Sequence, residues 1–289
     1  MYKFKPILKT LVWGTESWVL SGVPGNESVV AEGPGTGRKI TDLYPGQFPL
    51  LIKFIDAKRD LSIQVHPDDA LAEKRHGCLG KTEMWYVIDA APGAKLISGL
   101  KERITPDDYV RLVEQDRITE VLSEHAVAPG DVFFLPAGRI HAIGGGCLLA
   151  EIQQTSDITY SIYDYNRPGL DGKPRQLHTQ EAKDAIDYTV YPDYRTHYEP
   201  RKDEAVRLIG CPYFTTDLYD LSPNSLYSPQ TDSGAPFLIL IGLSGSGTVK
   251  TELDETILQS GEAVLVPSED GQVSFLSGPG GLRLLTTHP

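Results

Sequence analysis

Short apolar runs recur along the first two thirds of the chain, and each is followed by glycine, proline or other turn-forming residues. Runs of about 4–8 apolar residues bounded in this way are typical of β-strands. We therefore predict strands at residues 48–55, 61–65, 84–88, 95–98, 131–135, 148–152 and 158–162. The pattern predicts a mainly β fold.

Three segments depart from the strand pattern and predict short helices. Thr105 can cap a helix that starts at Pro106, and Asp107 and Asp108 place acids in its first turn. Apolar residues at helical spacing continue to about residue 124, so we predict two short helices inserted between strands within residues 105–124. A third helix is predicted at residues 179–185.

The chain changes character after residue 188. Residues 188–204 are polar and rich in tyrosine, proline and arginine, and we interpret them as a connection between domains. Strands are predicted beyond it at residues 214–219, 237–242, 248–251, 263–266 and 273–275. We interpret the Gly/Ser-rich stretch 242–249 as a tight turn, because it lacks the Lys-Ser/Thr ending of a phosphate-binding loop. Two domains are expected, at residues 1–190 and 205–289.

Composition and charge exclude several classes of partner. The 289 residues include 40% hydrophobic and 23% charged residues, which is typical of globular proteins. A net charge of −12 argues against nucleic acid as a partner. No apolar run approaches the roughly 18–20 residues of a membrane span, and the first 22 residues lack the apolar core of a signal peptide. The three cysteines, Cys78, Cys147 and Cys211, have no CxxC spacing, so we expect a reducing, cytoplasmic location. The sequence does not indicate the oligomeric state.

The segment from Gly130 to His141 has the pattern Gly–x5–Pro–x–Gly–x2–His. It predicts a strand, a turn made by Pro136 and Gly138, and a second strand that begins with the histidine. This spacing resembles the second conserved motif of cupins, in which that histidine is a metal ligand. The asparagine that usually closes the motif is replaced here by Gly145.

Further candidate ligands lie on the predicted strands upstream. Residues two apart on a strand point to the same face, so Gln64 and His66 are expected to project together, and Glu83 begins the next strand. Alone, such a histidine is more often structural and such a glutamate is more often a solvated charge. Together with His141 they form a mixed nitrogen and oxygen set that suits zinc and also fits manganese or iron.

The run from Leu61 to Asp68 (LSIQVHPD), the Lys81-x-Glu83 pair and the motif ending in His141 closely resemble type I mannose-6-phosphate isomerase in its short bacterial form. The resemblance covers residues 1–190, and the C-terminal part only in length and β character. It implies two cupin-like jelly-roll β-barrels with short helical insertions. The first would bind the metal and the second would have no metal ligands. It also implies a zinc-dependent aldose–ketose isomerase, with one zinc per chain, that interconverts mannose 6-phosphate and fructose 6-phosphate.

The resemblance also implies roles for individual residues. Lys53, Ser62 and Lys81 match positions that line the substrate pocket, and Glu151 falls near an acidic position of that pocket. Lysine charges and a serine hydroxyl suit a sugar phosphate. The metal ligands would be Gln64, His66, Glu83 and His141. The isomerisation also needs a base, for which Glu151, a hydroxide on the metal and a neutral side chain near His141 are the candidates.

One position departs from the family pattern. The family usually has a catalytic arginine where this chain has Ser161, and the next arginine is Arg167, followed by Lys173 and Arg175. A serine supplies neither the charge nor the forked donors of a guanidinium. Either another cation such as Arg167 substitutes, or the enzyme is slow, or its substrate differs. The alternatives are therefore a non-enzymatic or low-activity cupin that binds a sugar phosphate, and a different metal-dependent cupin enzyme.

Overall fold

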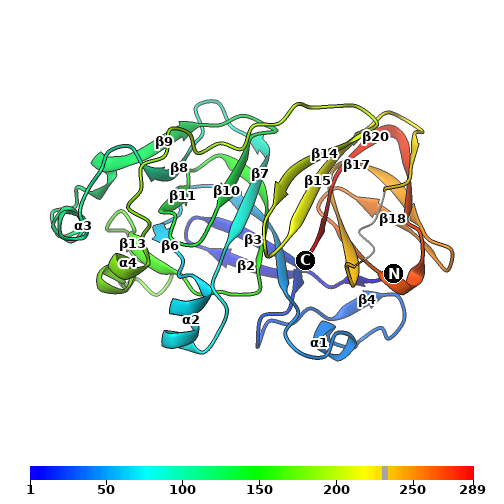
Figure 1. Ribbon diagram of the computed structural model, residues 1–289, viewed down its shortest axis with the longest axis horizontal. Coiled ribbons are helices and arrows are strands. Elements are labelled where there is room, and N and C mark those ends of the chain that lie inside the picture. The colour runs from blue at the N-terminus through cyan, green and yellow to red at the C-terminus, as the bar shows by residue number, and fades with distance from the viewer. Residues whose placement is uncertain (230–233) are drawn as a thin grey trace. The chain divides into compact units, whose positions relative to one another are not determined.

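A computed structural model describes residues 1–229 and 234–289, and these divide into two compact units (Figure 1). The central unit comprises residues 8–18 and 51–196, and the terminal unit comprises residues 1–7, 19–50 and 197–289. The chain thus passes between units near residue 196, within the segment predicted as a connection. Residues 1–7 and 19–50, which the sequence analysis placed with the first domain, belong to the terminal unit.

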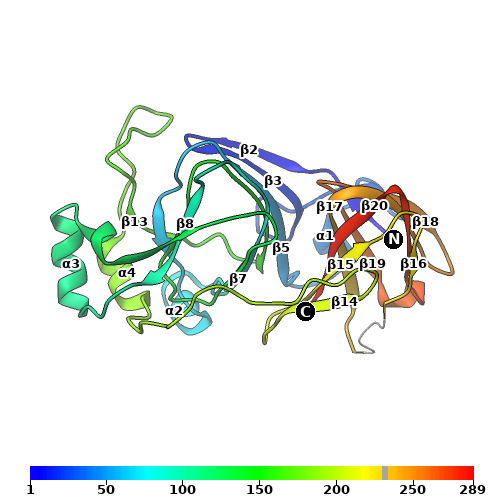
Figure 2. The ribbon, with the colours of Figure 1, turned by 90° about the horizontal axis from the view of Figure 1, so that it is seen from above.

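The central unit is built on two sheets whose strands are strongly curved (Figure 2). The six-stranded sheet has the order β10 (Val132–Leu135), β7 (Glu83–Ala90), β12 (Cys147–Gln154), β5 (Leu50–Ala57), β3 (Gly14–Ser21) and β2 (Ile7–Leu11). The five-stranded sheet has the order β13 (Tyr160–Tyr163), β6 (Ile63–Val65), β11 (His141–Ile143), β8 (Lys95–Leu100) and β9 (Leu122–Ala126). All the strands predicted before residue 188 are present, and the hairpin of β2 and β3 was not predicted.

Two apolar clusters hold the central unit together. One is made of large side chains from both sheets, among them Trp85, Phe133 and Leu149, which are completely buried. The other joins the five-stranded sheet to the helices α3 (Pro106–Glu114) and α4 (Thr179–Ala185), with Tyr109 at 0% exposure. Full burial of each such side chain contributes about 1.5–3 kcal/mol. The clusters therefore fix the two sheets on which the site residues lie.

The observed helices agree with some of the predicted helices and differ from others. Helix α3 begins after Thr105, whose hydroxyl accepts a hydrogen bond from the Asp108 amide, and α4 has the predicted bounds. The second predicted helix is a 3-10 turn, η1 (Ile118–Val121), and the chain then enters β9. Helix α2 (Asp69–His76), which begins after the cap Asp68, was not predicted. Among the described residues, no helix is long and apolar enough to cross a membrane.

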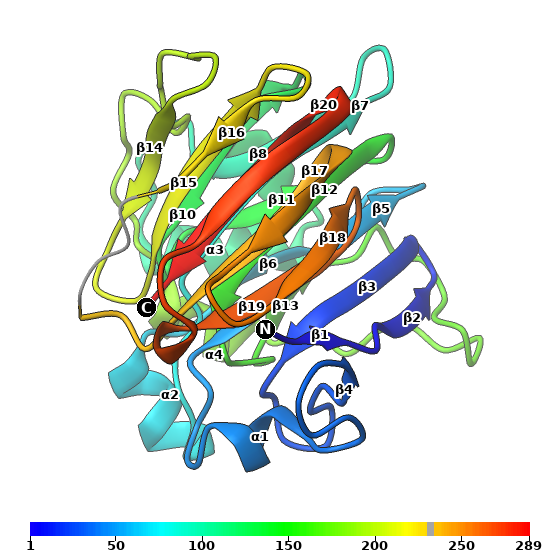
Figure 3. The ribbon, with the colours of Figure 1, turned by 90° about the vertical axis from the view of Figure 1, so that its right-hand side faces the viewer.

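The terminal unit contains a seven-stranded antiparallel sheet (Figure 3). Its strands run β14 (Ala205–Gly210), β15 (Thr215–Leu221), β20 (Ser274–His288), β17 (Phe237–Lys250) and β18 (Glu255–Gln259), and β16 (Leu226–Tyr227) and β19 (Ala263–Pro267) pair at its sides. The unit also holds the pair β1 (Lys3–Phe4) and β4 (Val30–Glu32), and helix α1 (Ile40–Leu43). Its core comprises buried aliphatic and aromatic residues such as Leu240, Val264 and Phe275.

The tight turn expected within residues 242–249 is wrong, because β17 runs through this stretch without a break. The glycines permit close pairing between strands. A Cβ on Gly242 would lie 2.1 Å from the Gln259 carbonyl oxygen, and one on Gly247 would lie 2.7 Å from the Leu276 carbonyl oxygen. Register shifts at Gly242/Ser244 and Gly245/Gly247 bend the strand and let it continue.

Candidate metal centre and active site

Strand register places a row of polar side chains on one face of the five-stranded sheet. His141 on β11 lies directly opposite Gln64 on β6 and Ser98 on β8, and Gln64 lies opposite Ser161 on β13. Residues opposite each other across antiparallel strands point to the same face. The predicted strand–turn–strand motif positions His141, because Pro136 accepts the turn hydrogen bond from the Arg139 amide.

The six-stranded sheet contributes a second row that faces the same interior. Glu83 at the start of β7 lies opposite Gln153 on β12, and Trp85 lies opposite Glu151. The carboxylate of Glu83 reaches the other sheet, with its Oε1 3.3 Å from His141 Nε2 and its Oε2 3.5 Å from His66 Nε2. The site is therefore formed where the two sheets of the central unit face each other.

Both histidines are held in the form that a metal requires. Nδ1 of His66 donates to the Ile158 carbonyl at 2.9 Å, and Nδ1 of His141 donates to the Arg139 carbonyl at 2.8 Å, which directs each Nε2 lone pair toward Glu83. Burial, followed by the charge of Lys81, lowers the pKa of His141 to about 3 and holds the pKa of His66 well below its ordinary value. Both rings are therefore neutral near neutral pH.

The carboxylate of Glu83 has capacity left for a cation. It is completely buried, and neither of its oxygens accepts a hydrogen bond from the residues described, although Lys81 Nζ forms an ion pair with Oε2 at 2.8 Å. Burial and the charge of Glu151 together raise its pKa. Lys81 Nζ also lies 3.0 Å from His66 Nε2, so the cluster already attracts one positive charge.

One atom each from His66, Glu83 and His141 lie within 4.8 Å of one another, which fits a single metal ion. Gln64 Nε2 lies 3.3 Å from His141 Nε2, and turning this amide by 180° would place its oxygen among the ligand atoms. Two imidazoles, a carboxylate and an amide oxygen form a donor set suited to zinc, manganese or iron. The four predicted ligands are thus adjacent in space.

A pocket of about 770 Å³ opens beside this cluster, within the range of small-molecule sites. Gln64 and Lys81 line it, and the two histidines and Glu83 lie behind them with at most 1% exposure. The other predicted site residues that line it are Lys53, Ser62, Glu151 and Ser161.

Two buried lysines and a buried glutamate form an ion-pair network in the pocket wall. Lys53 Nζ lies 2.9 Å from Glu151 Oε1, and Lys81 Nζ lies 4.0 Å from the same oxygen. The Trp85 indole donates to the other oxygen, Oε2, at 2.8 Å. Burial alone would raise the pKa of Glu151, but the charges of the two lysines outweigh it and lower the pKa below its ordinary value. Glu151 is therefore ionised near neutral pH.

Ser161 and Arg167 occupy different surroundings. Ser161 is 2% exposed and lines the pocket, and its backbone amide donates to His178 Nδ1 at 3.2 Å. Arg167 is not among the residues that line the pocket. Its guanidinium donates to the Asp60 carbonyl and to Asp164, each at 2.5 Å. The structure does not bring Arg167 together with the other predicted site residues.

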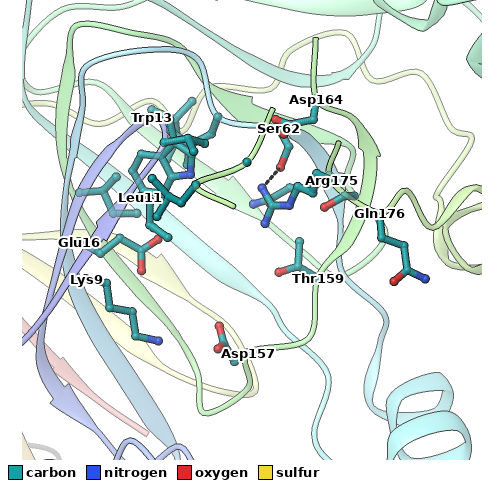
Figure 4. Close-up of a pocket in the computed structure, with 18 of the residues that line it drawn as sticks. Lys9, Leu11, Trp13, Glu16, Ser62, Asp157, Thr159, Asp164, Arg175 and Gln176 are labelled. Carbon is teal, nitrogen blue, oxygen red and sulfur yellow. Dashed lines mark hydrogen bonds between the residues drawn. The ribbon is translucent and has the colours of Figure 1, made fainter. Parts of the chain in front are cut away.

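The structure adds pocket residues that the sequence analysis missed. Glu16 and Trp18 lie on β3, where Glu16 Oε2 accepts a hydrogen bond from the Trp18 indole at 2.5 Å and lies 4.0 Å from Lys53 Nζ. Figure 4 shows Glu16 and Lys9 on one side of the pocket and Arg175 on another, where its guanidinium donates to Ser62. The apolar run from Trp18 to Leu20, which directly follows the polar residues Glu16 and Ser17, was the available signal for this strand.

Known proteins resemble the chain over nearly its whole length. The profile of the catalytic domain of type I phosphomannose isomerase matches residues 19–89. Mannose-6-phosphate isomerase ManA of Bacillus subtilis is 34% identical over 294 residues, covering 91% of this chain and 92% of the relative. Mannose-6-phosphate isomerase of Streptococcus mutans is 33% identical, covering 94% of this chain and 88% of the relative. The crystal structure of the mannose 6-phosphate isomerase from Bacillus subtilis has a TM-score of 0.88 at 30% identity and covers 100% of this chain and 99% of its own.

Proposed function

Because this chain belongs to the mannose-6-phosphate isomerase family, we propose that its pocket interconverts mannose 6-phosphate and fructose 6-phosphate with one bound zinc ion. The observation that carries this proposal is the convergence of His66, Glu83 and His141 beside a pocket lined by cations and hydroxyls. The donor set suits zinc, and Gln64 offers a fourth ligand atom.

The reaction moves a proton between C1 and C2 of the open-chain sugar while negative charge develops on the attached oxygens. A bound divalent cation supplies positive charge that stabilises those oxygens without any redox change. The protein must hold the sugar so that these two carbons lie at the metal end of the pocket, which contributes several kcal/mol to catalysis in general.

The side chains of the pocket have separate roles in holding the sugar. Glu151 is ionised and accepts hydrogen bonds from Lys53 and Trp85, so it holds the two buried lysines at the pocket wall. A carboxylate with a lowered pKa is a weak base, which favours this positioning role for Glu151. Ser62 presents a hydroxyl, and Lys81 lies between the pocket and the metal ligands.

We extend the proposal to the domains. The central unit, with its two facing antiparallel sheets, corresponds to the catalytic cupin domain, and the terminal unit corresponds to a second cupin-like domain. Residues 1–229 and 234–289 contain a group of three potential metal ligands only in the central unit. Three unpaired cysteines are compatible with a reducing, cytoplasmic location.

A coupled assay that follows fructose 6-phosphate formed from mannose 6-phosphate tests the activity. Metal analysis of the same samples tests the site: His141→Ala should lose stoichiometric zinc and turnover, whereas His288→Ala, a half-buried histidine of the terminal unit, should keep both. Full zinc retention in His141→Ala would contradict the metal assignment. Measurable sugar-phosphate binding without turnover in the zinc-loaded protein would favour a binding protein instead.

A further inference from the structure

The charges of the pocket are unevenly balanced. Lys53 Nζ lies 2.9 Å from Glu151 and 4.0 Å from Glu16, and Lys81 Nζ lies 2.8 Å from Glu83. Both lysines are 4% exposed and are compensated by carboxylates at short range. They have little positive charge left for a phosphate dianion, so the phosphate of a substrate requires another cation.

Arg175 offers that cation. It lies in the segment between β13 and α4 and lines the pocket, where its Nη1 donates to Ser62 Oγ at 3.1 Å (Figure 4). Within residues 1–229 and 234–289, no carboxylate lies within ion-pair distance of its guanidinium. Ser62 is a neutral hydroxyl and occupies one of five N–H donors, so the charge and most of the donors stay available.

The pocket contains two other cations that carboxylates do not compensate, but they are less well placed. Lys9 Nζ lies 3.3 Å from the centre of the Trp18 ring, across the pocket from Ser62. Among the residues that the structure describes, Lys173 is held through its backbone, which pairs with Gly169 and the Asp171 side chain. Of these three cations, and within the described part of the chain, Arg175 alone has a side-chain hydrogen bond to Ser62, the residue that directly precedes β6 and its candidate ligand Gln64.

The segment that carries Arg175 is itself anchored. The guanidinium of Arg167 holds its start through Asp164 and the Asp60 carbonyl, and the Gly169 amide donates to the Lys173 carbonyl at 2.7 Å. These bonds shape the turn that returns the chain to the pocket at Arg175. Arg167 therefore supports the segment, while Arg175 faces the ligand.

The spacing along β6 matches a sugar phosphate. Gln64 lies in the middle of β6, and Ser62 and His66 flank the two ends of this short strand, so Ser62 lies about 7 Å from Gln64 and farther from His66. A six-carbon chain whose C1 and C2 lie at the metal cluster would extend its other end toward Ser62. On this basis, and given the proposed isomerase function, we propose that Arg175, together with the Ser62 hydroxyl, binds the phosphate of the substrate. The fork of a guanidinium matches two phosphate oxygens.

The test compares four variants of the full zinc-loaded protein in steady-state kinetics with mannose 6-phosphate, in inhibition by inorganic phosphate, and in calorimetric titration with inorganic phosphate. Arg175→Gln should raise KM and the inhibition constant of phosphate by the same factor, about tenfold, with kcat and zinc content nearly unchanged. Arg175→Lys keeps the positive charge without the forked donors, so its KM and its inhibition constant for phosphate should lie between those of the wild type and of Arg175→Gln. Arg111→Gln, an exposed arginine of α3, is the matched control and should leave all values unchanged.

Unchanged KM and phosphate inhibition in Arg175→Gln would overturn the inference, and so would a larger rise in KM for Arg167→Gln than for Arg175→Gln. The calorimetric arm separates this inference from the proposed function. If the wild type shows no turnover but binds phosphate in a way that Arg175→Gln weakens and Arg111→Gln does not, the function fails and the phosphate site stands. If the wild type binds no phosphate, the inference fails.

Discussion

Replacing Glu151 by glutamine removes one negative charge from the pocket wall and nearly preserves the shape of the side chain. Lys53 donates to Oε1 of the carboxylate and Trp85 donates to Oε2, so the single amide oxygen can still accept one of these two hydrogen bonds and the NH2 group replaces the other acceptor. Also lost is the charge that balances two buried ammonium groups, Lys53 at 2.9 Å and Lys81 at 4.0 Å. The variant therefore removes the charge of Glu151 and one acceptor with little change in volume.

The magnitude follows from these distances. At an effective dielectric constant of about 20, the attractions amount to roughly 6 and 4 kcal/mol for charges 2.9 and 4.0 Å apart. Desolvation of the ions and repulsion from Glu83 oppose this attraction. Removing one partner of a buried pair typically costs about 3–5 kcal/mol. We expect Glu151→Gln to lower the free energy of unfolding at pH 7 by this amount.

Tryptophan fluorescence in urea measures this change, because all three tryptophans, Trp13, Trp18 and Trp85, belong to the central unit. The signal reports the unit that contains the network, whatever the terminal unit does. A Lys53→Met/Glu151→Gln double variant leaves one fewer uncompensated charge, so it should recover about 1–3 kcal/mol relative to Glu151→Gln. Recovery would identify charge, and not the shape of the pocket wall, as the cause.

The pH dependence has a defined sign. The folded-state pKa of Glu151 lies below its ordinary value of 4.5, so its contribution to stability is complete above about pH 4.5 and is lost as the pH falls further. The difference in unfolding free energy between wild type and Glu151→Gln should therefore shrink below pH 4.5. A constant difference down to pH 3 would contradict the lowered pKa.

The same variant, Glu151→Gln, should also change the turnover of the enzyme. Glu151 is not among the candidate metal ligands, so the variant should bind metal as the wild type does. Turnover should fall about 100-fold, because displacement of catalytic groups by about 1 Å has effects of this size. A variant that loses less than about 1 kcal/mol of stability and keeps full turnover would refute the reasoning about this network.

Two further substitutions test the pocket and the packing. Ser161→Arg places a large side chain where only 2% of the residue is exposed, so we expect kcat/KM to stay unchanged or fall in the wild type and to rise in the Arg175→Gln background. A rise in the wild-type background would instead show that the serine limits the reaction. Gly99→Ala should lower the urea midpoint by the equivalent of about 2–3 kcal/mol, because its φ is +79° and a Cβ would lie 2.1 Å from a tyrosine ring. Gly93→Ala has a similar φ of +81° with nothing within 4 Å, so it should cost only about 1 kcal/mol.

Much of the central unit was predictable because its local patterns agree with its tertiary structure. The strand predicted over residues 61–65 correctly placed Gln64 on β6 with His66 just after it, and the Pro136–Gly138 turn correctly placed His141 at the start of a strand. These features depend on residues close in sequence, so period and turn chemistry are sufficient to find them.

Errors arose where pairing between distant strands overrides a local preference. Leu122 and its neighbours have helical spacing, yet Leu122 pairs with Leu100 in a sheet. Gly242 and Gly247 resemble a turn, yet each allows another strand's backbone to approach closely. A glycine that allows a bend and one that allows close pairing look alike in a single sequence.

The cations that were expected to bind the substrate show that the sequence also fails to reveal long-range partners in the site itself. From sequence, Lys53 and Lys81 are positive charges on the correct strands, and both were expected to serve a phosphate. Their charge is balanced by Glu16, Glu83 and Glu151, two of which come from strands far away along the chain. Whether a lysine can bind an anion depends on such partners, which no local pattern reveals. For this reason we assign the phosphate site to Arg175, on a surface segment, whose one side-chain hydrogen-bond partner among the described residues is the neutral hydroxyl of Ser62.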